Sequence, residues 1–193
     1  MVRSSVRTRP CRVSWTRRAG IAVLAMLVSR SSFNLISRCA AEETTECHDS
    51  HYVIQPQAEK YVFSEVNRLR VEVGLEPLKK NLKLQVAARD HSCEMARLGY
   101  FSHDDFQGRN LQQRLAPLRL MWQTIAENIA KCQDSSPART AVDGWFHSPG
   151  HKRNMLNPDF TETGIGAVVN QEGEVSFCQI FMRPNGKASE LPK

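Results

Sequence analysis

The stretch Trp145-Phe-His-Ser-Pro-Gly-His-Lys-Arg-Asn-Met-Leu-Asn157 contains a proline elbow between two predicted helices. Serine followed by proline marks a helix start, because serine caps the first backbone amides and proline suits the first helical position. Ser136-Pro137 therefore opens a helix that runs to about Phe146, and Ser148-Pro149 opens a shorter helical turn. This turn ends near Asn157-Pro158.

A β-hairpin is predicted shortly after this stretch. Two strand-like runs, residues 164–170 and 175–182, flank the turn Gln171-Glu-Gly-Glu174. Gly164 and Gly166 lack side chains, and we expect them to allow close packing of the first strand.

Helical periodicity dominates the chain before the stretch. Residues 57–73 place apolar side chains at helical spacing, and Gly74 ends that helix. Asn81 is a suitable N-cap for a second helix, which Gly99 ends. His91 lies on the apolar face of the second helix, which favours a hydrogen-bonded core histidine over a ligand.

A short helix over residues 110–116 and a strand over residues 122–130 are predicted between the second helix and the elbow. Helices at both ends of a small set of strands predict an α+β or sandwich architecture. We expect one domain over residues 58–183, followed by a flexible tail at residues 184–193.

Residues 1–41 have the features of a secretory signal peptide. They include eight arginines and no acidic residue, and the apolar run Ile21–Val28 is too short to span a bilayer. Cys39-Ala-Ala41 offers small residues suited to cleavage, which leaves residues 42–57 as a linker. We therefore expect a secreted or periplasmic protein. An uncleaved membrane anchor is the alternative, and Thr16-Arg-Arg18 also resembles a twin-arginine signal.

The positive charge of the chain belongs to this leader. The whole chain has 26 basic and 20 acidic residues, and removal of the eight leader arginines leaves 18 basic residues and a net charge of −2. A domain with this balance has no large positive field to attract phosphates, so nucleic acid is not an expected partner. No transmembrane span is predicted in the mature chain, and we expect a monomer.

Four cysteines remain after the leader: Cys47, Cys93, Cys132 and Cys178. An even number in an exported chain favours structural disulfides over reactive thiols. Three pairings are possible, and all three stay open.

Four polar side chains stand in unusual local settings. His103 lies in a loop rich in aromatic and small residues, and Glu127 stands inside an apolar run where an unpaired carboxylate would be costly. His151 follows the proline elbow, and Glu162 precedes the first hairpin strand. Two imidazoles with one or two carboxylates form a ligand set that zinc prefers, and they equally suit a proton-transfer network. A buried polar network that stabilises the fold is the third interpretation.

Four strings in order carry a family resemblance: Gly99-Tyr-Phe-Ser-His103, Ala126-Glu-Asn-Ile129, the stretch from Trp145 to Asn157, and Phe160-Thr-Glu-Thr-Gly-Ile-Gly166. Together they resemble the CAP superfamily of cysteine-rich secretory, antigen 5 and pathogenesis-related proteins (also called SCP/TAPS), in its compact bacterial form. The resemblance covers residues 58–183. It implies a three-layer α-β-α sandwich with a cleft on one side.

The resemblance also implies which residues line that cleft. Many members have two histidines and two acidic residues there, and the cleft can take a divalent metal such as zinc. His103 and His151 match the two histidines by motif position. Glu127 matches the acidic residue of the family's Gly-Glu-Asn motif, which is Ala-Glu-Asn here.

The second acidic residue departs from the family pattern. Animal and plant members have a glutamate where this chain has Ser148. Glu162 or Asp143 is expected to replace it, and Glu162 is preferred because the chain returns toward His151 there. A metal ion, if bound, would be held by His103 and His151.

Two classes of function follow from the resemblance, and whether the protein is an enzyme stays open. The preferred one is a non-enzymatic extracellular or periplasmic module that binds a lipid, cell-wall or matrix partner through its cleft. The alternative is a zinc-assisted hydrolase or peptidase, in which metal on His103 and His151 activates water and Glu127 acts as general base. A module whose polar cluster only stabilises the sandwich is a third possibility.

Overall fold

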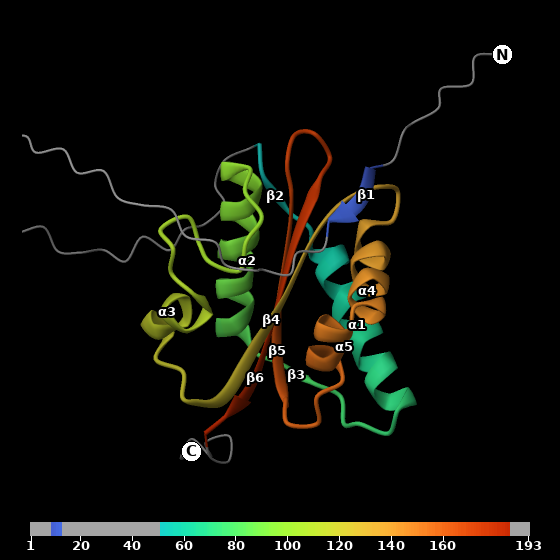
Figure 1. The fold of residues 1–193 in the computed structure, drawn as a ribbon, viewed down its shortest axis with the longest axis vertical. Coiled ribbons are helices and arrows are strands. Elements are labelled where there is room, and N and C mark those ends of the chain that lie inside the picture. Colours follow the sequence, from blue (N-terminus) through green and yellow to red (C-terminus); the bar gives the residue numbers. More distant parts are fainter. Residues whose placement is uncertain (1–8, 13–50, 186–193) are drawn as a thin grey trace, which may run out of the picture.

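The computed structural model describes residues 9–12 and 51–185, in which helices cover both faces of one sheet (Figure 1). The predicted signal peptide at residues 1–41 lies outside the described residues apart from 9–12. Residues 42–50 of the predicted linker and residues 186–193 of the predicted tail also lie outside them. These three assignments therefore stay predictions. Among the described residues, no helix is long and apolar enough to cross a membrane.

The middle layer is a six-stranded sheet in the order β1-β4-β6-β5-β2, with β3 paired to β5 off this path. Its neighbouring strands are antiparallel, except that β3 runs parallel to β5. The strands are β1 (Arg9–Arg12), β2 (Val53–Ile54), β3 (Lys79–Lys80), β4 (Trp122–Gln133), β5 (Glu162–Val169) and β6 (Val175–Pro184).

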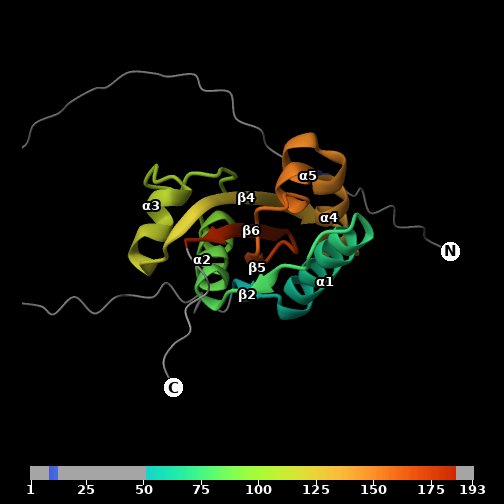
Figure 2. The same ribbon diagram turned by 90° about the horizontal axis from the view of Figure 1, so that it is seen from below.

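Two helical layers enclose the sheet, so the predicted three-layer α-β-α sandwich is confirmed (Figure 2). One layer packs α1, α4 and α5 against one face, and the other packs α2 and α3 against the opposite face. The helices are α1 (Pro56–Glu72), α2 (Leu82–Leu98), α3 (Leu111–Leu115), α4 (Pro137–His147) and α5 (Pro149–Met155), with a 3-10 turn η1 (Ala116–Leu118) after α3.

Successive side chains of β6 point to opposite faces of the sheet and so contribute to the core on both sides of it. Phe177 and Phe181 point to the α1–α4–α5 layer, whereas Cys178 and Ile180 point to the α2–α3 layer. Trp145 is fully buried in the first half, where its Nε1 donates to a backbone oxygen of β4 and so anchors α4 to the sheet.

The helix and hairpin boundaries lie within a few residues of those predicted, and β4 extends three residues further than expected. The very short strands β2 and β3 were missed, because two residues cannot display an alternating pattern. Ser136 and Ser148 do occupy N-cap positions, but neither side chain makes a capping hydrogen bond. Of the two features of the Ser-Pro helix start, the structure therefore shows the proline at the first turn but not the serine side-chain cap.

Gly164 and Gly166 bring β5 into direct contact with the backbone of α2. A Cβ atom at Gly164 would lie 2.2 Å from the backbone nitrogen of Gln85, and one at Gly166 would lie 2.4 Å from the carbonyl carbon of Ala88. The sequence predicted close packing of this strand at the two glycines, and the structure shows that the element packed against them is α2. Any side chain at either position would push α2 away from the sheet.

A buried arginine joins α1 to the loop after α5. The Arg70 residue is 1% exposed and forms no ion pair with any described residue. Its guanidinium instead donates to backbone oxygens of Glu76, Met155, Asn157 and Phe160 at 2.8 to 3.0 Å. One side chain thus satisfies backbone acceptors that would otherwise be buried without partners.

Candidate functional site

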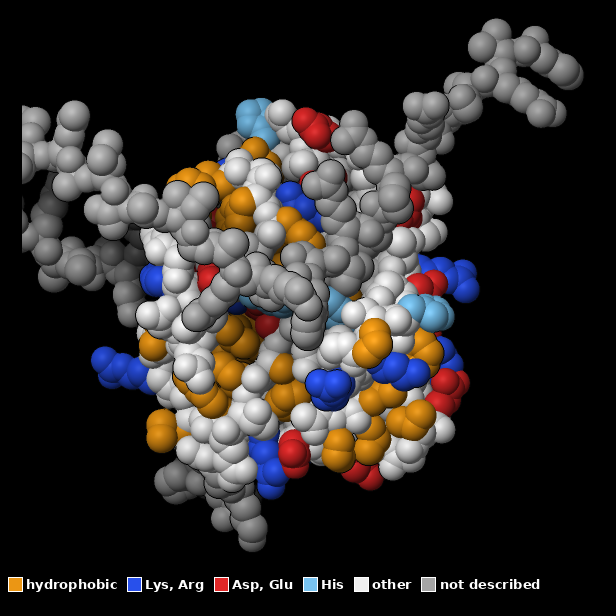
Figure 3. All heavy atoms as spheres, in the orientation of Figure 1, with side chains coloured by type: hydrophobic (Ala, Val, Ile, Leu, Met, Phe, Trp, Pro, Cys, Tyr) orange, Lys and Arg blue, Asp and Glu red, His pale blue; other side chains and the backbone are white. Residues whose placement is uncertain are grey.

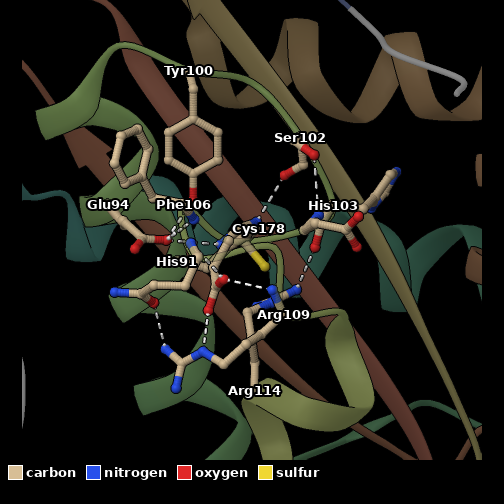
Figure 4. A network of polar contacts seen from close by, with 12 residues as sticks. His91, Glu94, Tyr100, Ser102, His103, Phe106, Arg109, Arg114 and Cys178 are labelled. Carbon is tan, nitrogen blue, oxygen red and sulfur yellow. Dashed lines mark hydrogen bonds and ion pairs between the residues drawn. The ribbon is translucent and has the colours of Figure 1, made fainter. Parts of the chain in front are cut away.

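A buried carboxylate on β4 is the centre of the candidate site, and Figure 4 shows the three side chains that bond to it, those of His103, Arg114 and Cys178. The Glu127 side chain is 2% exposed, and its Oε1 accepts a hydrogen bond from Nδ1 of His103 at 2.9 Å. Its Oε2 accepts from Nη2 of Arg114 at 2.5 Å and from Sγ of Cys178 at 3.1 Å. Donors from a loop, a helix and a neighbouring strand therefore converge on one carboxylate.

These contacts decide the charge of Glu127. Burial alone would raise the pKa of its carboxyl, because the charged form loses its hydration. The hydrogen bond from His103 and the positive charge of Arg114 outweigh burial and lower the pKa of Glu127 to about 2. The carboxylate is therefore ionised at neutral pH.

Arg114 is brought to this carboxylate by α3, which begins at a capping box. Asn110 and Gln113 exchange side-chain and backbone hydrogen bonds at the start of the helix. The Arg114 side chain is 7% exposed, and its Nη2 also donates to the backbone oxygen of His103 at 3.2 Å. Its Nε and Nη1 have no partner among the described residues.

The loop that carries His103 is held in shape from both sides. Asp105 accepts a hydrogen bond from the backbone nitrogen of Arg109 at 2.8 Å and pairs with its Nε at 2.6 Å. His91 donates from Nε2 to the backbone oxygen of Ser102 at 2.9 Å, and its side chain is 1% exposed. The predicted core role of His91 is thus confirmed. The His103 side chain remains 33% exposed at the end of this loop.

His151 lies on α5 and is tied to β4. Its Nδ1 makes a hydrogen bond with Oγ of Ser148 at 2.9 Å, and its backbone oxygen accepts from Asn128 at 3.2 Å. Asn154 donates to Asn128 at 2.9 Å and completes the connection. Burial, together with the electrostatic effect of the nearby His103, lowers the pKa of His151. The two imidazoles therefore lie within electrostatic reach of each other.

The two candidates for a second acidic residue lie elsewhere. Glu162 accepts a hydrogen bond from Asn81 at 2.6 Å, on β5, which is separated from β4 by β6. Asp143 lies exposed on α4, where its backbone oxygen bonds His147. No described contact joins either carboxylate to His103, Glu127 or His151, and the described residues contain no group of three or more side chains able to hold a metal ion.

Arg114 and Cys178 contribute to the site without having been predicted from the sequence. Arg114 is one of several arginines in a polar segment, and nothing in its spacing indicates burial. Cys178 is a free, buried thiol, and burial with the nearby charge of Glu127 raises its pKa. Cys93 is disulfide-bonded and Cys178 is not, so the expectation that all four cysteines pair is wrong for Cys178. Cys47 lies outside the described residues, and which cysteine pairs with Cys93 stays a prediction.

Histidine atoms reach the surface near the middle of the face shown in Figure 3. A cavity of about 840 Å³ lies between the end of α2 and the β5–β6 hairpin. A second cavity of about 420 Å³ lies between α1 and α2. Neither is lined by any of the four predicted cleft residues, so the cleft that the resemblance implies is not confirmed.

Comparison with known proteins gives the family. The model of the CAP family, described as the cysteine-rich secretory protein family, matches residues 63–181. The chain belongs to this family. The CAP domain thus spans α1 to β6 and contains both predicted histidines and Glu127.

Two relatives from Bacillus subtilis (strain 168) are similar to this CAP domain. The membrane protein YlbC is 36% identical over 113 residues, which are 58% of this chain and 32% of YlbC. The protein YkwD is 34% identical over 110 residues, which are 57% of this chain and 42% of YkwD. The aligned part is thus less than half of either relative.

Solved structures share the fold. An extracellular protein containing an SCP domain from Bacillus anthracis superposes with a TM-score of 0.60 at 29% identity, over 67% of this chain and 41% of that one. An outer surface protein from Borrelia burgdorferi superposes with a TM-score of 0.64 at 21% identity, over 70% of this chain and 98% of that one. The second likeness concerns the fold alone.

Proposed function

We propose that this chain is an exported CAP-domain module that binds a lipid, cell-wall or matrix ligand at the surface around the part-exposed His103, near the buried His151. The observation that carries the proposal is the fixed position of His103. Its Nδ1 is held by buried Glu127, while a third of the side chain faces solvent. An imidazole held in this way offers Nε2 to a ligand with little further loss of conformational entropy.

Export is supported by the leader pattern of residues 1–41 and by the likeness to the extracellular SCP-domain protein of Bacillus anthracis. Neither the basic leader nor the near-neutral domain suggests a nucleic-acid partner.

The state of Glu127 favours binding over hydrolysis. A general base must take a proton from water near neutral pH, and its pKa should lie near the working pH. Glu127 has a pKa of about 2, and both of its oxygens already accept hydrogen bonds. Its role is therefore to orient His103 and to balance the charge of Arg114.

The donor set fits a metal poorly. Nε2 of His103 and Nε2 of His151 could act as ligands, since both Nδ1 atoms are already bonded. Zinc sites in proteins use three or four protein ligands. Glu127 is not available as a third, because the cationic Arg114 lies on its second oxygen. We expect zinc in the purified full chain to lie well below one ion per molecule by elemental analysis, and a stoichiometric value would contradict this.

Co-sedimentation of the purified full chain tests the binding proposal. The two probes are liposomes of phosphatidylglycerol and phosphatidylcholine, and purified bacterial cell-wall sacculi. The His103→Ala/His151→Ala double variant should lose binding to whichever probe retains the wild type. His147→Ala is the matched control, because His147 is exposed and bonds only within its own helix. If the double variant and the wild type sediment equally, the ligand does not bind at the two histidines. If the wild type sediments with neither probe, lipid and cell wall are both excluded as ligands.

A hydrolase remains the alternative function, and one observation supports it. The Glu127–His103 pair resembles the acid–histidine pair that orients a general base in many hydrolases. In that case His103 and not Glu127 would accept the proton. A Glu127→Gln variant should then lose activity on fluorescent casein or cell-wall substrate, and the absence of wild-type activity on both would end this alternative.

A further inference from the structure

The outer edge of β5 is paired only at its two ends. β2 pairs with Val168 and Val169, and β3 pairs with Glu162 and Thr163. Between them, no described strand pairs with residues 164–166 on this edge. This gap lies between α1 and α2, at the opposite edge of the sheet from β4 (Figure 2).

A side-chain bridge spans this gap from one helical layer to the other. Glu59 of α1 has a side chain 5% exposed and accepts a hydrogen bond from Gln85 of α2 at 2.9 Å. Arg89 of α2 binds both oxygens of Glu59, through Nε at 2.8 Å and Nη2 at 2.6 Å. The charge of Glu59 is thereby balanced. Nη1 of Arg89 stays available, since no described residue accepts a hydrogen bond from it, and the side chain is 32% exposed.

The cavity of about 420 Å³ lies beside this bridge and has two kinds of wall. Its apolar wall includes Phe63 and Ile165, and Lys60, Lys80 and Arg89 also line it. Neither lysine ammonium forms an ion pair or hydrogen bond with any described residue. Three cations against the single carboxylate of Glu59 give the cavity an excess of two positive charges, in a domain that is slightly acidic after its leader.

We propose that this cavity binds a small organic anion. Its carboxylate or phosphate group lies between Lys60, Lys80 and the free Nη1 of Arg89, and its apolar part packs against Phe63 and Ile165. The cavity size is in the range of small-ligand sites, about 300–1,000 Å³. Several cations in one cleft beside an apolar wall favour an anion that has an apolar body. This site is independent of the proposed histidine surface, because none of its lining residues belongs to that surface.

Isothermal titration calorimetry of the full chain tests the site. Benzoate and phenyl phosphate are the two anionic probes, and benzyl alcohol is the uncharged probe of similar size. At least one anion should bind with a Kd below about 1 mM, whereas benzyl alcohol should not bind. Comparison of the two anions tells a carboxylate site from a phosphate site. No binding of either anion, or equal binding of benzyl alcohol, would overturn the proposal.

Charge substitutions locate the binding. The Lys60→Gln/Lys80→Gln variant should bind the anion at least about tenfold more weakly. Both lysines are exposed, so the fold should be kept, which the melting temperature checks. Lys79→Gln is the matched control, because Lys79 precedes Lys80 on β3 and does not line the cavity. Unchanged affinity in the double variant, or an equal loss in Lys79→Gln, would show that the anion binds elsewhere.

Discussion

Two buried arginines on opposite sides of the sheet are satisfied in different ways. Arg70 donates from all three of its nitrogens to backbone oxygens, and its partners come from loop and helix ends. Arg114 binds a carboxylate and one backbone oxygen, and its Nε and Nη1 have no partner among the described residues. The first region is a closed network that joins parts of the chain. The second is incompletely satisfied, which is common where a protein binds or reacts.

Removal of Arg70 should give the largest effect. Arg70→Met leaves four backbone acceptors without their donor, two of them buried and two partly buried, and each buried group costs about 1–3 kcal/mol. We expect the free energy of unfolding, measured with urea, to fall by about 4 kcal/mol or more. Arg68→Met on the exposed side of the same helix is the control and should change stability far less. Similar losses for the two variants would show that the Arg70 network contributes little.

The second-largest effect should be a loss of stability at low pH that comes from Glu127. The folded pKa of about 2 lies below the ordinary value of 4.5, so this group stabilises the fold above pH 4.5, and the contribution is lost as pH falls toward 2. Its size is about 3 kcal/mol. Urea unfolding at several pH values should show this loss in the wild type, and Glu127→Gln should lack that component. A parallel pH dependence of the two proteins would contradict the assigned charge state.

Arg114 should give the smallest of the three effects. Arg114→Met removes one donor from Glu127, but His103 and Cys178 still donate to the carboxylate. We expect a loss of about 2 kcal/mol, and a smaller loss when the substitution is made in a Glu127→Gln background. A double-mutant cycle by urea unfolding measures this difference. Simple additivity would mean that the two side chains are not coupled.

Most of the architecture could be predicted from local patterns. Helix boundaries followed from periodicity with Gly74, Asn81 and Gly99, and the hairpin followed from two strand-like runs around a turn. The edge strands β2 and β3 could not be predicted, because their pairing depends on contact with β5 and not on their own residues. The side-chain caps expected of Ser136 and Ser148 do not form, and Ser148 instead bonds His151.

The candidate site was predicted less completely than the fold. His103, Glu127 and His151 were singled out from their local settings and from the family resemblance, and the structure joins His103 to Glu127 by a hydrogen bond. The preference for Glu162 as the second acid rested on the return of the chain toward His151. That return brings β5 to the sheet two strands from β4, where Glu162 bonds Asn81.

The sequence by itself determined the α+β class, the helices and main strands, the family and the two histidines, because each depends on short strings or on regular spacing. Only the tertiary structure decided the charge and the hydrogen-bond partners of Glu127. The donors Arg114 and Cys178 lie 13 and 51 residues from it along the chain, and folding brings them onto one buried carboxylate. A pKa depends on burial and on neighbouring charges in space, and residue order does not specify either.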